Sequence, residues 1–340
     1  MTRVTRFLRW ELGLLVLAGV LFVVMSTLSS AFLNSFTLQS LALNATVIGF
    51  LALGEAAVIM TADIDISVAS MAALCGVVIA ELWLHGFNIW LACGVGVVLG
   101  AGLGLINGLA VVLMDLPALA VTLGTMGAYT GVAYLILGGS AVTNFPPSLV
   151  GLGSNTLGST PLPISTAVLL VLAAMMAFVI HRSNFGRSVL AVGANRQAAR
   201  FSGLAVVRTR VMAFVLSGAF AAVAAIFYLG YFNSIDAGSA TSDLLPTVTV
   251  VLLGGVSAYG GSGTIPGVVI ALAVIGIVQS GLGVLGLSGE EEQIAVGIVL
   301  VLTVASSTLV RWLRARSASR PESGGRSVGA EQGPPLAADG

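Results

Sequence analysis

The positive charge of this chain is confined to three short segments. All 14 basic residues among the 340 are arginines. They precede the first apolar run, lie in one central segment, or follow the last apolar run: Arg3, Arg6 and Arg9; Arg182, Arg187, Arg196, Arg200, Arg208 and Arg210; Arg311, Arg314, Arg316, Arg320 and Arg326. Mostly Leu, Val, Ala, Ile and Gly lie between them. Such segregation is typical of a chain that crosses a membrane repeatedly and keeps its basic segments on the cytoplasmic side.

The composition excludes an ordinary soluble protein. Hydrophobic residues make up 57% of the chain and charged residues 8%, against roughly 25% charged in a soluble domain. We predict an all-α, polytopic bundle of transmembrane helices, because a helix satisfies its own backbone hydrogen bonds in lipid. A span needs roughly 20 apolar residues, and we place ten, at 12–32, 42–60, 67–84, 89–113, 118–137, 162–181, 210–232, 243–257, 264–286 and 293–310.

Ten crossings return all three arginine segments to one side of the membrane. Both termini are therefore predicted to be cytoplasmic. We divide the chain into a transmembrane domain, 1–316, with a cytoplasmic loop at 182–209, and a tail, 317–340. The tail is rich in Ser, Gly, Pro and Ala and is predicted to be disordered.

Small residues recur along the fourth predicted span. Gly96, Gly100, Gly104 and Gly108 fall on one helix face, a spacing that lets two helices approach closely in a membrane. The motif Asn-Gly-Leu at 107–109 resembles Ser-Gly-Leu at 280–282, 173 residues later. Five spans separate the copies, so the pattern indicates a possible inverted repeat, which is common in transporters.

The central arginine segment carries more than charge. Residues 185–203 read as a short amphipathic helix that Asn195 caps and Gly203 ends. The segment either sets only the topology or offers a surface helix to a partner protein. The glycines and small residues favour the second interpretation, because topology needs only charge.

Two carboxylates follow the second predicted span. Asp63 and Asp65 lie with no basic residue nearby in sequence, and Glu55 lies one turn deeper. Placing an acidic residue within or close to a membrane span costs free energy, and such residues are usually functional. The alternative is that Asp65 caps the third span. A metal site has little support, because no further ligands cluster nearby.

Catalytic motifs are missing from the sequence. It contains no nucleophile elbow, no HExxH and no paired cysteines, and without lysine it cannot form a Walker A loop. We therefore expect no enzyme activity and no cofactor on this chain, and no nucleic acid among its partners.

Four stretches carry a resemblance to a known family. VIMTADIDISVAS, NGLAVVLMDLPALAVTLGTMGAYTGVAYLILGG, FGRSVLAVGANRQAARFSGL and VLLGGVSAYGGSGTIPGVVIAL follow one another in the chain. Together they resemble bacterial ABC transporter permeases for ribose, rhamnose and autoinducer 2, within the branched-chain amino acid and sugar permease superfamily. The sequence departs from the family pattern at Ala62-Asp63, Ala69, Asp243 and Pro246.

The resemblance implies a fold like that of type II ABC importers in the bacterial cytoplasmic (inner) membrane. An ABC ATPase subunit, which binds ATP and Mg, would drive import. An extracytoplasmic sugar-binding protein and a second permease, identical or different, would complete the complex. The coupling residues would be Arg187, Gly193, Asn195, Ala199, Arg200 and Gly203, and we select as pathway or gate candidates Glu55, Asp63, Asp65, Ser67, Asn107, Thr122, Thr125 and Asp243.

Two other functions are compatible with the residues. Glu55, Asp63 and Asp65 could carry protons in a secondary transporter. Asp63 and Asp65 could hold a divalent metal in an intramembrane enzyme. The sequence leaves open which sugar would be imported.

Overall fold

A computed structural model describes residues 3–158, 160 and 162–318, with side chains described from Trp10 to Ala305 apart from the two gaps. Two units divide the chain, 1–304 and 305–340, and the first is considered below. The predicted tail, 317–340, lies outside the described residues from 319 onward, and residues 317–318 belong to the last helix.

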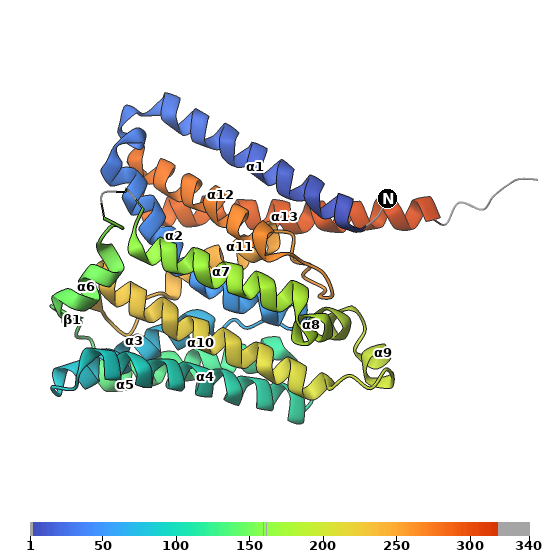
Figure 1. The fold of residues 1–340 in the computed structure, drawn as a ribbon, viewed down its shortest axis with the longest axis horizontal. Coiled ribbons are helices and arrows are strands. Elements are labelled where there is room, and N and C mark those ends of the chain that lie inside the picture. The colour runs from blue at the N-terminus through green and yellow to red at the C-terminus, as the bar shows by residue number, and fades with distance from the viewer. Residues whose placement is uncertain (1–2, 159, 161, 319–340) are drawn as a thin grey trace, which may run out of the picture. The chain divides into compact units, whose positions relative to one another are not determined.

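The described chain is almost entirely helical (Figure 1). Its helices are α1 (Arg3–Leu28), α2 (Ser35–Met60), α3 (Val68–Leu84), α4 (Ile89–Leu113), α5 (Ala118–Leu137), α6 (Pro147–Ser154), α7 (Ile164–Arg182), α8 (Asn184–Ala194), α9 (Arg196–Phe201), α10 (Val206–Phe232), α11 (Leu244–Leu253), α12 (Ile265–Val284) and α13 (Gly289–Ala318). Short 3₁₀ helices cover Ser30–Leu33 and Thr241–Asp243. Strands β1 (Val142–Thr143) and β2 (Ser234–Ile235) pair antiparallel. The prediction of an all-α polytopic bundle is confirmed.

Each of the ten predicted spans overlaps one of these helices. Seven helices are long and apolar enough to cross a membrane over their described residues, namely α1, α2, α4, α5, α7, α10 and α12. Helices α3 and α11 are shorter, and α13 continues beyond the described side chains. The count of ten crossings therefore stays a prediction. The stretch 138–161, which lies between two predicted spans, contains α6, which begins with the favourable Pro147.

Helix α2 lies at the centre of the unit because its sequence is apolar on every side. Almost all its residues from Leu43 to Met60 are buried, as expected for such a helix. Helix α10 packs antiparallel to it: Gly54 lies against Ser217 near the end of α2, and Phe50 stacks on Phe227 with ring centroids 4.8 Å apart.

As the spacing indicates, the glycine face of α4 is in close contact with other helices: three of its four glycines lie against α10, and Gly96 lies against Ile79 of α3. A Cβ at Gly104 would overlap the carbonyl oxygen of Phe214, and one at Gly100 would overlap that of Gly218. One at Gly108 would lie 3.0 Å from the Cα of Val211. These two backbones are in direct contact, so no side chain fits between them.

The helix order supports the inverted repeat. Shifted by 173 residues, α2 would cover 208–233, and α10 covers Val206–Phe232. In the same way α3 corresponds to α11 with its preceding 3₁₀ turn, α4 to α12, and α5 to α13. Corresponding helices also have corresponding neighbours, because α4 packs on α10 and α12 packs on α2. Since α2 and α10 are antiparallel, the two halves have opposite orientations.

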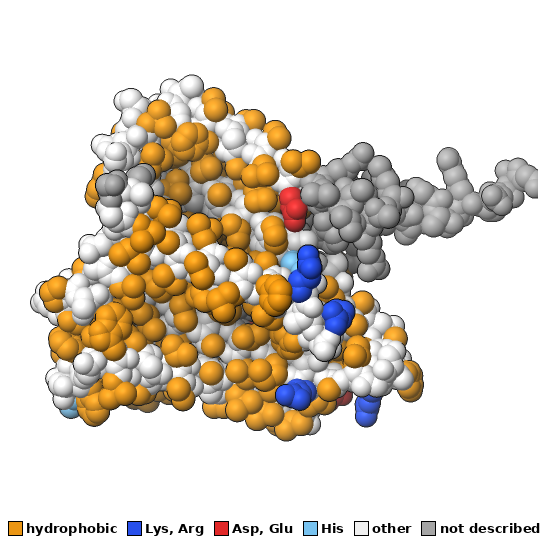
Figure 2. All heavy atoms as spheres, viewed as in Figure 1, with side chains coloured by type: hydrophobic (Ala, Val, Ile, Leu, Met, Phe, Trp, Pro, Cys, Tyr) orange, Lys and Arg blue, Asp and Glu red, His pale blue; other side chains and the backbone are white. Residues whose placement is uncertain are grey.

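The positive charge of the described side chains is concentrated at one end of this unit (Figure 2). Helices α8 and α9 lie there, whereas α6 and β1 lie at the opposite end (Figure 1). The described arginine side chains visible in Figure 2 gather at the α8–α9 end, and hydrophobic side chains cover most of the remaining visible face. The arrangement is that of a bundle whose sides face lipid.

Candidate functional site

An ion-pair cluster holds the link between α2 and α3. This link, residues 61–67, is called the elbow below; its second residue, Ala62, lies in the left-handed region (φ 63°). Arg210 of α10 binds Asp63 through two bonds, Nε to Oδ2 at 2.7 Å and Nη2 to Oδ1 at 2.8 Å. Arg196 of α9 donates to Asp63 Oδ1 at 2.8 Å. Asp63 and Arg210 are buried, whereas the side chain of Arg196 is 42% exposed, so one carboxylate joins three separate segments where the buried bundle meets its surface.

Arg196 also closes the end of α2. Its Nη2 donates to the carbonyl of Ala62 at 2.8 Å, where a cation is favourable because helix carboxyl ends carry partial negative charge. The N–H of Gly261 donates to the carbonyl of Met60 at 3.0 Å. The elbow, the α8–α9 loop and the turn before α12 therefore meet at one point.

A second cluster follows in the elbow around Asp65. The N–H and hydroxyl of Ser67 donate to Asp65 Oδ1 at 3.0 and 2.6 Å, and the Ser217 hydroxyl donates to Oδ2 at 3.2 Å. The N–H of Asp65 donates to Glu55 Oε1 at 3.1 Å. Asn107 Nδ2 donates to Ser67 Oγ at 2.7 Å. These five residues are buried and connect α2, α4 and α10 to the start of α3.

The network extends to α5. The hydroxyl of Tyr129 donates to Asn107 Oδ1 at 2.9 Å, and Thr122, which is buried, donates to the carbonyl of Ile64 at 3.2 Å. Thr125, half-buried, donates to the carbonyl of Thr122 at 3.3 Å. Seven of the eight pathway candidates thus belong to the hydrogen-bonded contacts around the elbow, and all seven except Thr125 are buried; Asp243 is not part of these contacts.

The capping interpretation of Asp65 needs one adjustment. Ser67 precedes the first residue of α3, and Asp65 accepts from the Ser67 N–H two residues earlier. This is an Asx turn leading into the helix, rather than the cap itself. The carboxylate stabilises the start of α3 through Ser67.

Asparagine should replace Asp65 better than alanine does. Asparagine keeps an acceptor for Ser67, and its amide faces the rotatable hydroxyl of Ser217. Alanine leaves buried donors unpaired, at about 1–3 kcal/mol each. We expect Asp65→Ala to lower the melting temperature and uptake strongly, and Asp65→Asn to change both little. Complete loss of uptake in both variants, at normal melting temperature, would point to proton carriage.

The predicted coupling loop consists of two helices, α8 and α9, instead of one. Asn195 caps α9 by accepting from the N–H of Ala198 at 2.9 Å, and Gly203 follows α9 with φ 77°. Both sequence-based assignments are consistent with this geometry. Arg187 and Arg200 are exposed, and Arg187 bonds to the carbonyl of Arg182 at 3.2 Å.

Two of the six proposed coupling residues face inward. Gly193 and Ala199 are buried within the chain itself. A Cβ at Gly193 would overlap the carbonyl oxygen of Met60 and lie 2.5 Å from the nitrogen of Gly261. Within the described chain Gly193 therefore packs against its own neighbours, and its contact with a second protein stays a prediction. The residue lets α8 lie directly on the end of α2.

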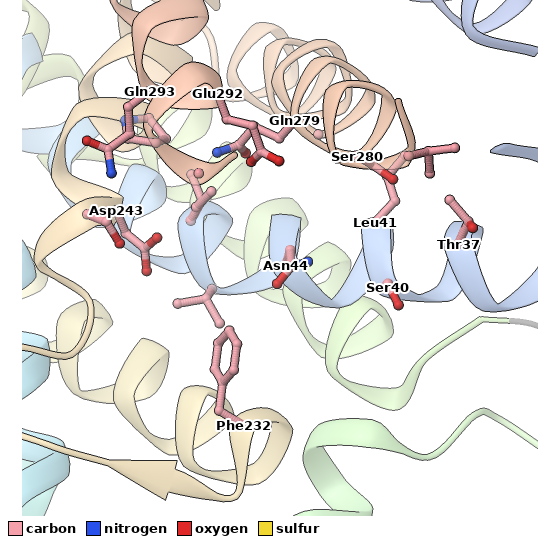
Figure 3. Close-up of a pocket in the computed structure, with 18 of the residues that line it drawn as sticks. Thr37, Ser40, Leu41, Asn44, Phe232, Asp243, Gln279, Ser280, Glu292 and Gln293 are labelled. Carbon is pink, nitrogen blue, oxygen red and sulfur yellow. The ribbon is translucent and has the colours of Figure 1, made fainter. Parts of the chain in front are cut away.

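A polar cavity lies away from the elbow, between α2, α12, the start of α13 and the segment before α11. Its volume is about 430 Å³. Figure 3 shows side chains from these elements around one space. The polar lining residues are Thr37, Ser40, Asn44, Ser242, Asp243, Gln279, Ser280, Glu292 and Gln293. Asp243 is the one pathway candidate among them.

Residues 37–304 match the protein family described as branched-chain amino acid transport system / permease component. The chain belongs to this permease family. The match covers every helix described above from α2 to α12 and the first half of α13. It includes the elbow, the α8–α9 loop and the cavity, so the multi-pass fold is that of a membrane permease.

Curated relatives of this permease carry a more specific name. The autoinducer 2 import system permease protein LsrD of Yersinia enterocolitica (serotype O:8 / biotype 1B) is 31% identical over 306 residues, covering 88% of this chain and 92% of the relative. That of Klebsiella pneumoniae subsp. pneumoniae is 32% identical over 321 residues, covering 91% and 95%. No solved structure matches this permease.

Sequence reasoning missed three residues of this site. Arg196 and Arg210 were assigned only to a basic loop, although Arg210 stands at the edge of an apolar span, where a buried charge requires a partner. Phe201, at the end of α9, has 83% of its surface exposed. In the sequence, the available indication of a contact surface was a phenylalanine beside an arginine in a polar segment.

Proposed function

We propose that this permease forms the membrane pathway of an ATP-driven importer for a monosaccharide or similar small polyol. The similarity to LsrD proteins over most of both chains carries the proposal, since their name assigns them to autoinducer 2 import. A separate ABC ATPase would bind ATP and Mg, and an extracytoplasmic binding protein would deliver the ligand. A second permease, identical or different, would complete the complex in the bacterial cytoplasmic membrane.

The construction of the α8–α9 loop supports coupling to an ATPase. The inner side of the loop is fixed by Gly193 against Met60 and by Arg196 on the elbow. Its outer side presents Arg200 and Phe201. A loop that is rigid toward the bundle and exposed outward can pass a displacement directly to the elbow.

The acids give less support to a proton-coupled transporter. Both oxygens of Asp63 are bound by guanidinium groups, and Asp65 accepts three hydrogen bonds. Asp63 and Asp65 are thus engaged as acceptors through both oxygens, whereas Glu55 accepts through Oε1 and has no partner at Oε2 among the described residues. Over the described residues, no group of three or more His, Cys, Asp or Glu side chains is placed to hold a metal ion, so a metal-dependent enzyme is not favoured either.

Phe201→Ala should weaken binding of the ATPase and leave folding of the permease unchanged. Because Phe201 makes few contacts with its own chain, we expect an unchanged melting temperature, loss of most co-purifying ATPase, and loss of ATP-driven uptake in proteoliposomes. Phe178→Ala, on the lipid-facing side of α7 and 67% exposed, is the matched control. Full ATPase recovery with Phe201→Ala would contradict a docking role, and absence of any ATPase with the unmodified chain would contradict the proposed function.

Orientation can be measured with single cysteines, since both native cysteines are buried. Cysteines at Gly203 and Ser140 should react from opposite sides, Gly203→Cys only after the membrane is opened and Ser140→Cys in intact cells. This follows from placing the arginine segments inside. Labelling of Gly203→Cys in intact cells would reject the ten-crossing topology and the coupling loop together.

A further inference from the structure

Most polar side chains of the cavity have no partner among the described residues, although Thr37 donates to the carbonyl of Ala31 at 2.9 Å. Among the described residues, Asn44, Asp243, Gln279, Glu292 and Gln293 make no hydrogen bond or ion pair through their side chains. At the elbow, by contrast, the polar side chains bind one another, with only Glu55 Oε2 left unpaired. Asn44 and Gln293 are exposed and Asp243, Gln279 and Glu292 are half-buried, so the cavity is accessible from outside and water can hydrate these groups until a ligand replaces it. The cavity therefore holds an unused hydrogen-bonding capacity that a ligand can take up.

The hydrogen-bonding and apolar side chains that line the cavity indicate which kind of ligand fits it. Asn44, Gln279 and Gln293 each offer two donors and an acceptor, and the hydroxyl groups offer both. Phe232, 47% exposed, and other apolar side chains complete the wall. Hydrogen-bonding groups of both kinds beside apolar surface suit a compact molecule with many hydroxyl groups and C–H faces between them.

The charges of the lining exclude other ligands. Asp243 and Glu292 are both carboxylic acids, and the described lining contains no arginine or histidine. In Figure 3, Asp243 and Glu292 border the same space. A phosphate or carboxylate on the ligand would enter beside these acids without a cation in the lining to offset the electrostatic repulsion. The cavity thus selects against anions.

We propose that this cavity is an intrasubunit binding site for a neutral, polyhydroxylated ligand and that it rejects the phosphorylated form of the same molecule. The proposal rests on the import function proposed above and adds the place and the charge selectivity. Asn44, Gln279 and Gln293 bind hydroxyl groups, and Asp243 and Glu292 accept from hydroxyl groups and repel anions. These five residues are specificity-determining residues of the permease.

Cysteine protection tests the site without ATP or ATPase. In Ser280→Cys, the thiol lies in the cavity lining beside Gln279. A cationic methanethiosulfonate should modify it at least about tenfold faster than an anionic one, because the carboxylates concentrate cations. D-Ribose, L-rhamnose or autoinducer 2 should slow modification, whereas ribose 5-phosphate should not. Asp243→Asn combined with Glu292→Gln should remove the charge preference.

Matched variants distinguish a specific loss of sugar binding from general damage to the protein. Ser202→Cys, exposed at the end of α9, should show no sugar protection and no preference for the cationic reagent. Gln279→Leu in the Ser280→Cys background should abolish protection. Gln39→Leu should keep it, because the Gln39 side chain instead donates to the carbonyl of Ser154 at 3.2 Å.

These results distinguish failure of the proposed binding site from failure of the proposed import function. Absence of protection by all three neutral probes, or equal protection by ribose 5-phosphate, overturns the binding site. If ATP-driven uptake is present in that case, the import function stands while the cavity assignment fails. Protection without any ATP-driven uptake supports the site and rejects the import mechanism.

Discussion

Replacing Asp63 with asparagine should destabilise the permease more than any other single polar change at the elbow. Asp63 neutralises the buried guanidinium of Arg210 and also binds Arg196. Removing one partner of a buried ion pair costs about 3–5 kcal/mol, because the other charge stays in a poorly solvated place. We expect a large fall in melting temperature in detergent and a low yield of monodisperse protein.

Asp115→Asn is the matched control for Asp63→Asn. Asp115 is exposed and has a φ of 51°, a conformation that asparagine also accepts, so its replacement should leave the melting temperature nearly unchanged. Adding Arg210→Met to Asp63→Asn removes the unpaired buried cation. The double variant should lose less stability than the sum of the two single variants. Equal melting temperatures for Asp63→Asn and the unmodified permease would show that the ion pairs contribute little.

Gly104→Ala should separate α4 from α10. The added Cβ overlaps the carbonyl oxygen of Phe214, so the two backbones must move apart along a long antiparallel contact. Overpacking typically costs about 1–3 kcal/mol, and we expect at least that here because a backbone atom, unlike a flexible side chain, cannot turn away. A fall in melting temperature with loss of folded protein in the membrane fraction is the expected result.

Replacing a glycine two residues away with alanine should have the opposite effect on the melting temperature. A Cβ at Gly102 meets no atom within 4 Å, and alanine is favoured over glycine in a helix by about 1 kcal/mol. Gly102→Ala should therefore raise the melting temperature slightly or leave it unchanged. Similar losses in both variants would indicate that α4 tolerates no substitution for general reasons and would contradict a specific contact with α10.

Much of the fold could be predicted because its causes are local in the sequence. Long apolar runs predict the helices, and glycines at every fourth position predict the close face of α4. Asn195 and Gly203 are recognisable because a cap and a left-handed glycine act on adjacent residues. Helix α6 was missed because Pro, Gly and Ser usually interrupt helices, although proline is favourable in a first turn.

The site could be predicted only in part, because its contacts join distant segments. Asp63 lacks basic neighbours in sequence, and only the approach of α9 and α10 brings Arg196 and Arg210 to it. The same limit applies to the cavity, where Asn44 and Gln279 come from helices α2 and α12. From residue type alone, Asp63 and Asp243 were both predicted to be acidic residues of the pathway or gate. Their partners distinguish them, since Asp63 is fully bound and Asp243 is free among the described residues.

The chain is synthesised from its N-terminus, so Asp63 is made before the two arginines that bind it. This order has a consequence for assembly in the cell. Arg196 follows Asp63 by 133 residues and Arg210 by 147. At synthesis rates of roughly 5–20 residues per second, the carboxylate waits about 7 to 30 seconds for its partners. During that time α2 also lacks α10 and α12, which later enclose it. Nascent chains that stop before α9 should therefore be recognised as incomplete and degraded, whereas chains that extend beyond α10 should persist.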